Sequence, residues 1–317
     1  MGSHLARQLL AQHYRVRALV RPGSTLAILQ NLFLDVVEGD ICHAADVLEA
    51  ARGCQGIIHA AALAQVNPAR DPAIWAVNLT GTENVVLAAR HHQVRRLVYV
   101  GTANVFGFGT KSHPGNEETP FAGYRYGLDY MDSKRAATNL ICQAAREHNL
   151  PAVLVHPSFL VGPLDAKPTS GAMLLAVARK QVPGYAAGGK NFIHVQDAAI
   201  ATVNALTMGR VGHSYILGHE NLTYREAFGL MASVAGVSAP GLAIPPGVLR
   251  AYGSLSEWWA TRTGHPARLT RPLADVANDG HYFSAQKAIN ELALPQTPVR
   301  EAVREAFEWF TKNGYLQ

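Results

Sequence analysis

The fold is decided between residues 56 and 100, where Gly56-Ile57-Ile58-His59-Ala60 and Arg96-Leu97-Val98-Tyr99-Val100 are two runs of strand length. Between them, apolar side chains recur at helical spacing from Ile74 to His91. A strand, a helix and a second strand in this order form a unit whose strands lie parallel in one sheet. The strands are apolar along nearly their whole length, which is typical of a parallel sheet covered by helices on both faces.

The same alternation continues on both sides of this unit. Strand-length runs occur at 15–20, 35–38 and 152–155, and a helical pattern extends from Tyr130 to Ala144. We therefore predict an α/β protein with a doubly wound parallel sheet.

A change of rhythm after about Pro163 predicts a second, smaller unit. Prolines and glycines interrupt shorter helical segments there, and aromatic residues gather at Trp258-Trp259. The expected division is a larger domain at 1–163, with a return of the chain to its sheet at about 191–218, and a mainly substrate-binding subdomain at 164–317.

The composition favours a well-packed protein that binds an anionic small molecule. Of 317 residues, 48% are hydrophobic and 16% charged, and the net charge is +5. The basic residues are scattered and lack the aromatic-interleaved stripe of a nucleic-acid-binding surface, so we expect no nucleic-acid partner. A basic balance suits an anionic small molecule. The three cysteines and fourteen histidines show no ligand spacing, so no metal site is predicted.

No integral membrane segment is expected. The residues after Met1 do not form the apolar region of a signal peptide. One uncharged run, from Ala227 to Leu249, has the length of a membrane span, but glycines and prolines interrupt it. It therefore predicts a helix, a loop and the start of another helix, and a soluble cytoplasmic protein is expected.

A phenol and an ammonium lie one helical turn apart in Tyr130-Met131-Asp132-Ser133-Lys134. Residues i and i+4 share one face of a helix, so Lys134 is expected beside Tyr130. A nearby cation favours the phenolate and lowers the pKa of a tyrosine, which makes the hydroxyl usable for proton transfer near neutral pH. The alternative is a helix with a buried tyrosine and a solvated lysine.

Further motifs occur in a characteristic order around this pair. They are Gly39-Asp40-Ile41, His59-Ala60-Ala61-Ala62, Asn78-Leu79-Thr80-Gly81-Thr82, Thr102-Ala103-Asn104-Val105-Phe106-Gly107, His156-Pro157, Asn191 to Asp197 and Tyr282 to Ala288. With these motifs the chain resembles the extended branch of the short-chain dehydrogenase/reductase family over nearly its whole length. A narrower likeness, carried by Ala18–Arg21 and Gly162–Thr169, is to dihydroflavonol-reductase-like and hopanoid-associated sugar epimerase-like proteins.

The resemblance implies a Rossmann-type fold and assigns roles to three residues. Tyr130 would be the general acid/base, and Lys134 would tune it and hydrogen-bond the nicotinamide ribose. The Thr102 hydroxyl would hydrogen-bond the same substrate oxygen as Tyr130; the alternative for Thr102 is an ordinary turn residue after a strand. The family commonly forms dimers through the helix that carries Tyr130 and the helix before it, so a homodimer is expected, and a monomer in light scattering would contradict this.

The resemblance also implies a set of cofactor contacts. Asp40 would contact the adenine with Ile41 beside it, although capping of a turn is an alternative role for Asp40. The other residues of this set are Pro157 against the nicotinamide, the catalytic Tyr130 and Lys134, and the small residues Ala60, Ala61 and Ala62.

The family's glycine-rich loop is present only in part. Gly2-Ser3-His4-Leu5 is similar to the last glycine of that loop where it enters the first helix, so Gly2 is a predicted cofactor residue. The first strand and the other two glycines are expected upstream of Met1, in a chain that is a fragment or a gene model begun too late. Without that central strand its neighbours lack ladder partners, and the pyrophosphate loses most of its backbone N–H cradle.

The residue after the first predicted strand bears on the choice of cofactor. NAD-binding relatives carry a carboxylate there for the ribose 2′-OH, whereas this chain has Val20-Arg21. An arginine suits a 2′-phosphate through bidentate pairing, so NADP(H) is favoured over NAD(H). The alternative for Arg21 is a solvated loop cation.

Three functions are compatible with these motifs. We favour an NADP(H)-dependent reductase or alcohol dehydrogenase of a fairly apolar small molecule, because the second half is rich in apolar and aromatic residues such as Phe228, Tyr252, Trp258 and Trp259. Packing of amphipathic helices explains those residues equally well. The second candidate is a nucleotide-sugar epimerase or dehydratase with tightly bound NAD(P), although such relatives usually carry an Arg-x-x-Asn-like pattern in place of 156–159. The third is a cofactor-binding relative without catalysis.

Overall fold

A computed structural model describes residues 1–24 and 26–316 and contains the predicted parallel sheet. Four strands lie in the order β3-β4-β5-β9, all parallel, and β1 and β2 form a separate parallel pair. Their bounds are β1 Arg17–Val20, β2 Asp35–Glu38, β3 Gly56–His59, β4 Arg96–Val100, β5 Ala152–Pro157 and β9 Ser214–Leu217. Among the described residues β1 pairs with β2 alone and β3 with β4 alone, so no hydrogen-bonded strand joins the two sheets.

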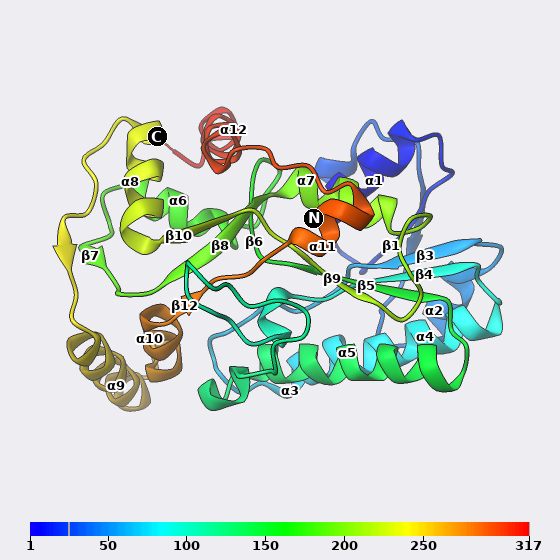
Figure 1. Cartoon of the computed structure of the whole chain (residues 1–317), viewed down its shortest axis with the longest axis horizontal. Helices are drawn as coiled ribbons and strands as arrows, with labels where there is room; N and C mark the ends of the chain where they lie inside the picture. The colour runs from blue at the N-terminus through cyan, green and yellow to red at the C-terminus, as the bar shows by residue number, and fades with distance from the viewer. Residues whose placement is uncertain (25, 317) are drawn as a thin grey trace.

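Helices cover both faces of the sheet, which confirms the doubly wound arrangement (Figure 1). One face carries α2 (Ala44–Ala51), α4 (Gly81–His91) and α5 (Asp129–Glu147), and the other carries α1 (Gly2–Ala11), α7 (Val195–Asn204) and α11 (Gln286–Leu292). Leu97, Tyr99 and Leu154 point into the first core, while Val98, Val153 and Val155 point into the second. Successive strand residues face opposite sides, so a strand buried on both sides must be apolar throughout.

The helix predicted over 74–91 is interrupted by a π-helical turn. α3 (Pro72–Trp75) is followed by η2 (Ala76–Thr80) and then α4. Asp71 caps α3 because its Oδ1 accepts a hydrogen bond of 2.9 Å from the backbone N–H of Ala73. π-helical turns occur frequently at functional sites, and here the turn contains Asn78, whose side chain is buried.

The second half builds a small mixed sheet that the sequence analysis did not predict. β8 (Gly189–His194) lies at its centre, antiparallel to β10 (Glu220–Thr223) and parallel to β6 (Phe159–Val161) and β12 (Gly280–His281). Its apolar core is shared with three helices, α6 (Gly171–Ala178), α8 (Tyr224–Ala235) and α12 (Val299–Lys312).

The remaining elements are short or lie at the end of the molecule. They are the pair β7 (Gly184–Tyr185) and β11 (Leu242–Ala243), the helices α9 (Pro246–Thr263) and α10 (Arg271–Asn278), and the 3₁₀ turns η1 (Ala27–Leu29), η3 (Ala103–Val105) and η4 (Gly123–Tyr126). The uncharged run 227–249 becomes the end of α8, a loop with β11 and the start of α9, as predicted. Within the described residues, no helix has both the length and the apolar character needed to cross a membrane.

Candidate active site

Three predicted catalytic residues meet at the carboxyl end of β4. Thr102 follows this strand, and α5 brings Tyr130 close enough for its side chain to hydrogen-bond that of Thr102. Lys134, one turn further along α5, is 2% exposed, and its Nζ donates a hydrogen bond of 2.9 Å to the carbonyl oxygen of Val100. The same Nζ lies 4.5 Å from the ring centre of Tyr99. The buried lysine is therefore aimed at the end of β4 and not solvated.

Gly101 permits a close approach behind this turn. A Cβ atom at this position would lie 2.3 Å from Nδ1 of His156. A side chain there would have to displace either the imidazole or the turn that presents Thr102. The Thr102 hydroxyl also accepts a hydrogen bond from the backbone N–H of Asn104, at 3.4 Å. Thr102 thus hydrogen-bonds both the backbone of its own turn and the side chain of Tyr130.

The pKa of Tyr130 differs from the sequence expectation. Burial raises the pKa of this phenol above its ordinary value, and the hydrogen bond with Thr102 opposes that rise. The expected lowering by Lys134 is not found, because the ammonium points to the backbone of Val100 and burial outweighs other influences. Tyr130 is therefore a neutral phenol at pH 7, ready to donate its proton.

Burial also changes the protonation of Lys134. Removal of the ammonium from water lowers the pKa of Lys134 to about 7. The two nearby imidazoles are buried, and the pKa of His59 and that of His156 are both lowered to about 3, first by burial and second by the charge of Lys134. Lys134 is therefore the group beside Tyr130 that changes charge near neutral pH.

We expect Lys134 to titrate near pH 7 in the free protein. The pKa of Lys134 is about 7 in the folded protein and 10.5 in its ordinary state. Between about pH 7 and 10.5 the unfolded chain therefore binds more protons at this lysine than the folded chain. The contribution of Lys134 to the free energy of unfolding accordingly rises with pH over this range. The check is NMR of protein labelled with ¹³C-lysine, in which one ε-methylene resonance should titrate near pH 7 and vanish in Lys134→Met. Titration of that resonance at the ordinary lysine pKa would contradict the assignment.

A buried amide holds the loop after β3 against the catalytic helix. Oδ1 of Asn78 accepts from the backbone N–H of Leu63 at 2.8 Å, and its Nδ2 donates to the Leu63 carbonyl at 3.1 Å. The same Nδ2 donates to Oγ of Ser133 on α5 at 3.0 Å. Asn78 belongs to the motif Asn78–Thr82, which predicted no role for its side chain. The available signal was its position, since Asn78 lies four residues after Ile74 and seven before Val85, on the apolar face of the helical pattern.

A second polar cluster joins the Thr102 turn to the mixed sheet. Nδ1 of His281, on β12, lies 3.2 Å from Oδ1 of Asn104, and the ring stacks on Phe108 at a centroid distance of 4.3 Å. The Tyr126 hydroxyl donates to Oδ2 of Asp279 at 2.6 Å. The cluster brings together residues about 180 positions apart. It forms a polar wall that joins β12 to the turn that begins at Thr102.

Tyr126 is buried in the polar wall, whereas Tyr124 is 71% exposed. His281 was not singled out, because only the topology of β12 brings it near Asn104.

Four of the predicted cofactor residues lie at strand ends of the two parallel sheets. Arg21, Asp40, Ala60 and Pro157 follow or end β1, β2, β3 and β5, so all lie at carboxyl ends of parallel strands, the edge where dinucleotides bind in doubly wound folds. Ala61 and Ala62 continue the loop after β3 with exposed side chains, Ile41 packs against Gly81 and the first core, and Gly2 opens α1.

Two of these residues act on each other electrostatically. The pKa of Asp40 is lowered first by the backbone N–H of Cys42, which donates to Oδ1 at 2.8 Å, and to a smaller extent by the charge of Arg21. The turn-capping role of Asp40 is therefore confirmed, and its contact with adenine stays a prediction. Arg21 is exposed, and no ion pair is recorded for it in the described chain. A guanidinium, small alanines and a buried lysine near these strand ends fit a dinucleotide cofactor.

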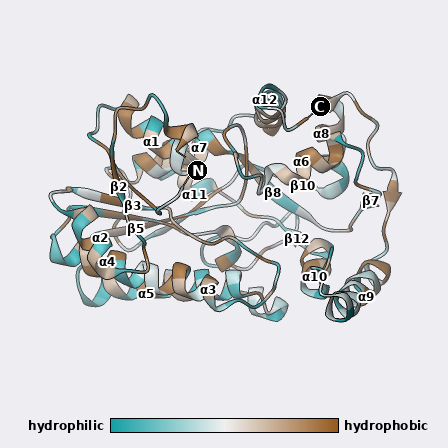
Figure 2. Cartoon of the chain, turned by 180° about the vertical axis from the view of Figure 1, so that it is seen from behind, coloured by the Kyte–Doolittle hydropathy of each residue, from teal (hydrophilic) through white to brown (hydrophobic). Residues whose placement is uncertain are grey.

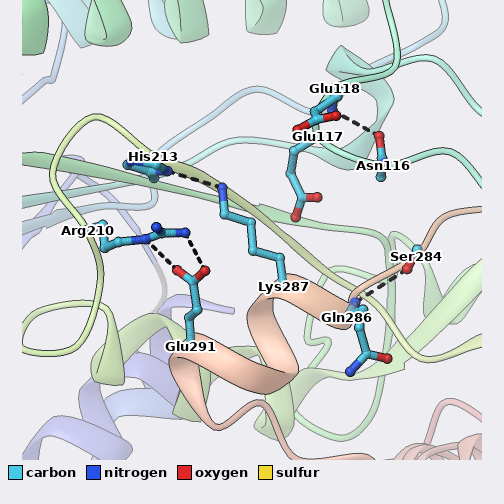
Figure 3. Close-up of a pocket in the computed structure, with 9 residues that line it drawn as sticks. All are labelled: Asn116, Glu117, Glu118, Arg210, His213, Ser284, Gln286, Lys287 and Glu291. Atoms are coloured by element: carbon cyan, nitrogen blue, oxygen red, sulfur yellow. Dashed lines mark hydrogen bonds and ion pairs between the residues drawn. The ribbon is translucent and has the colours of Figure 1, made fainter.

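A separate charged hollow of about 450 Å³ lies beside β9 and α11 (Figure 3). Four of its charged groups are engaged with one another or with the backbone: Arg210 pairs with Glu291, Nζ of Lys287 donates to the Ser214 carbonyl at 2.8 Å, and Glu117 accepts from the Ile216 N–H at 2.8 Å. None of the three predicted catalytic residues lines it. These groups tie the 116–118 loop and α11 to the edge strand, which is a structural role.

The family model described as the NAD dependent epimerase/dehydratase family matches residues 1–218. The chain belongs to this family. The likeness to the extended short-chain dehydrogenases/reductases drawn from the ordered motifs is thus confirmed.

Similar proteins extend over the whole chain. It is 32% identical to the "Putative dihydroflavonol 4-reductase" of Synechocystis sp., with 100% of this chain and 93% of the relative covered. It is 26% identical to "Sterol demethylase protein B" of Methylococcus capsulatus, with 100% and 97% covered. The crystal structure of gox2253 superposes with a TM-score of 0.88 at 33% identity, covering 100% of this chain and 96% of the other. Membership of this family, whose description names NAD-dependent epimerases and dehydratases, supports an enzyme.

Proposed function

We propose that this family member is an NADP(H)-dependent carbonyl reductase, or the corresponding alcohol dehydrogenase, of a fairly apolar small molecule. The observation that carries the proposal is the neutral Tyr130 hydroxyl beside Thr102 and the buried Lys134. The relatives named a dihydroflavonol reductase and a sterol demethylase protein support an apolar substrate. The exposed Arg21 near Asp40 supports a cofactor with a 2′-phosphate.

The proposed proton chemistry uses residues of this chain. When bound, a nicotinamide cofactor would supply the hydride to the carbonyl carbon. Tyr130 donates its hydroxyl proton to the carbonyl oxygen, which becomes the alcohol, and Thr102 hydrogen-bonds this oxygen as negative charge develops on it. The phenolate that remains on Tyr130 is reprotonated before the next turnover, since burial keeps the pKa of this phenol above its ordinary value.

The substrate side of the proposed site is the polar wall formed by Asn104, His281 and Tyr126. The pKa of His281 is lowered well below its ordinary value, first by burial, so its ring is neutral. We propose that this wall and residues 164–317 position the substrate over Thr102, while residues 1–163 hold the cofactor.

The test is to incubate the protein and NADPH with a panel of candidate substrates that contains apolar ketones and UDP-glucose. Steady consumption of NADPH with an apolar ketone is the expected result. The reduction consumes one NADPH per alcohol formed, which is followed by absorbance and by chromatography of the product. An epimerase is the second candidate, since the family includes them; it would convert the sugar nucleotide without net oxidation of the cofactor. Such turnover would refute the reductase, and nicotinamide binding without turnover of any compound in the panel would favour a cofactor-binding relative without catalysis.

A further inference from the structure

Helix α9 presents an apolar face that no other part of the described chain covers. Val248, Tyr252, Leu255 and Trp259 are spaced three or four residues apart, and at about 100° per residue they fall within roughly 60° of one another around the helix. Their exposed fractions run from 47% for Tyr252 to 61% for Leu255, and Trp258 beside them is 50% exposed. Gly253 is the one residue of α9 that is buried. The aromatic residues considered for substrate binding thus lie largely on the surface.

The position of α9 makes this face accessible. Figures 1 and 2 show α9 at one end of the molecule, beside α10 and away from the parallel sheet. A Cβ on Gly253 would approach Thr270 and Arg271 within about 3.1 Å, so the helix rests on the start of α10 through its opposite side. The apolar stripe therefore points outward.

The charges around this stripe are mainly basic. Arg262 lies with its guanidinium 4.9 Å from the ring centre of Trp258, and the exposed Arg268 follows in the next loop. Glu257 is the one acidic residue of α9, and by the helical angle it lies on the side opposite to the stripe. Arg250, also opposite, pairs with Asp275 at 2.6 Å. Exposed tryptophan, tyrosine and leucine with arginines beside them are typical of a helix that lies in the interface of an anionic bilayer.

We propose that the exposed face of α9 docks onto the surface of an anionic phospholipid membrane, with the helix lying in the plane of the interface. The charge complementarity favours anionic lipid over a second copy of the chain, because two copies of this face would bring their arginines together. Docking does not depend on the proposed reaction.

The contacts of α9 also connect this surface to the candidate substrate side. Nδ2 of Asn67, in the loop after β3, donates to the carbonyl oxygen of Ala267 between α9 and α10 at 2.9 Å. α10 ends at Asn278, followed by Asp279, which binds Tyr126 of the polar wall. These contacts join the end of the molecule that carries α9 and α10 to the polar wall beside Thr102.

The test is sedimentation of the full chain with vesicles of phosphatidylglycerol and phosphatidylcholine, or of phosphatidylcholine alone. We expect binding to the anionic vesicles at low salt, weakened by added salt. The double variant Trp259→Ser, Leu255→Ser should weaken binding by about tenfold or more, whereas Phe33→Ser, a change of a 99% exposed aromatic residue on the loop before β2, should leave it unchanged.

Two results would overturn the docking proposal. One is a wild-type chain that stays in the supernatant with both vesicle types. If that wild-type chain is a dimer and the double variant is a monomer, the exposed face of α9 binds a second copy of the chain and not a membrane. The other is equal binding by wild type and the double variant. If the variant does not fold, quenching of the wild-type tryptophans by lipids brominated in the acyl chains replaces it: quenching is expected, and its absence refutes insertion of α9.

Discussion

Tyr130→Phe is expected to lower kcat for ketone reduction by about 10²–10⁴-fold while leaving NADPH binding nearly unchanged, because a general acid contributes about this factor. The change removes one oxygen atom and its hydrogen bond with Thr102. It keeps the ring and its packing, so the melting temperature should move by only a few degrees. The measurement is steady-state kinetics with NADPH and the best ketone, together with binding followed by NADPH fluorescence.

The matched control is Tyr124→Phe, which removes the same atom from a tyrosine that is 71% exposed in the neighbouring 3₁₀ turn. It should retain wild-type kcat. If Tyr130→Phe retained more than about a tenth of wild-type kcat, the proton would have to come from another group. A loss confined to KM would assign Tyr130 to binding, since a group that acts only in the transition state lowers kcat.

The parallel sheet could be predicted from the sequence because its strands are buried on both sides. A strand such as β4, with Leu97, Val98 and Tyr99 all 0% exposed, must be apolar at successive positions and so is visible as a run. The mixed sheet of the second half has no such signature. Its strands are two to six residues long and carry polar residues such as Asn191 and Glu220. Their pairing is decided by tertiary contacts that the local sequence does not encode.

The candidate site was predictable where it depends on local spacing and not where it depends on contacts between distant residues. The i and i+4 spacing placed Tyr130 and Lys134 on one face of α5, and the ordered motifs placed Thr102 near them. The protonation states did not follow from spacing, since the Lys134 ammonium binds the Val100 carbonyl and burial governs both pKa values. The contact of His281 with Asn104 joins residues 177 positions apart, so only the fold reveals it.

The same distinction applies to the hydrophobic residues of the second half. Phe228 lies in the core shared by α8 and α12, as packing of an amphipathic helix predicts. Trp258 and Trp259 carry the same sequence signal but are half or more exposed. Apolar periodicity thus shows which residues share a helix face, whereas the tertiary structure decides whether that face meets the core or remains free for a partner.

Arg21→Ala is expected to lower kcat/KM for NADPH by about 10- to 100-fold and to change kcat/KM for NADH little, because a charged hydrogen bond to a phosphate contributes roughly 1.5–3 kcal/mol. NADH has a ribose hydroxyl where NADPH has the 2′-phosphate, so it makes no charged hydrogen bond with Arg21 that the substitution could remove. Arg21 is exposed at the end of β1 and near Asp40, so its truncation should leave the fold intact. The measurement is the ratio of kcat/KM for the two cofactors in wild type and variant.

The control for this change is Arg15→Ala, which removes an equally exposed arginine just before β1, at the end of the strand remote from the carboxyl edge. It changes the net charge by the same amount, so it separates a local contact with the phosphate from the general attraction of a basic protein for an anionic cofactor. A general effect would weaken NADPH equally in both variants and would fall with added salt. A wild type that prefers NADH, or an Arg21→Ala variant that loses both cofactors alike, would overturn the assignment of Arg21 to the 2′-phosphate.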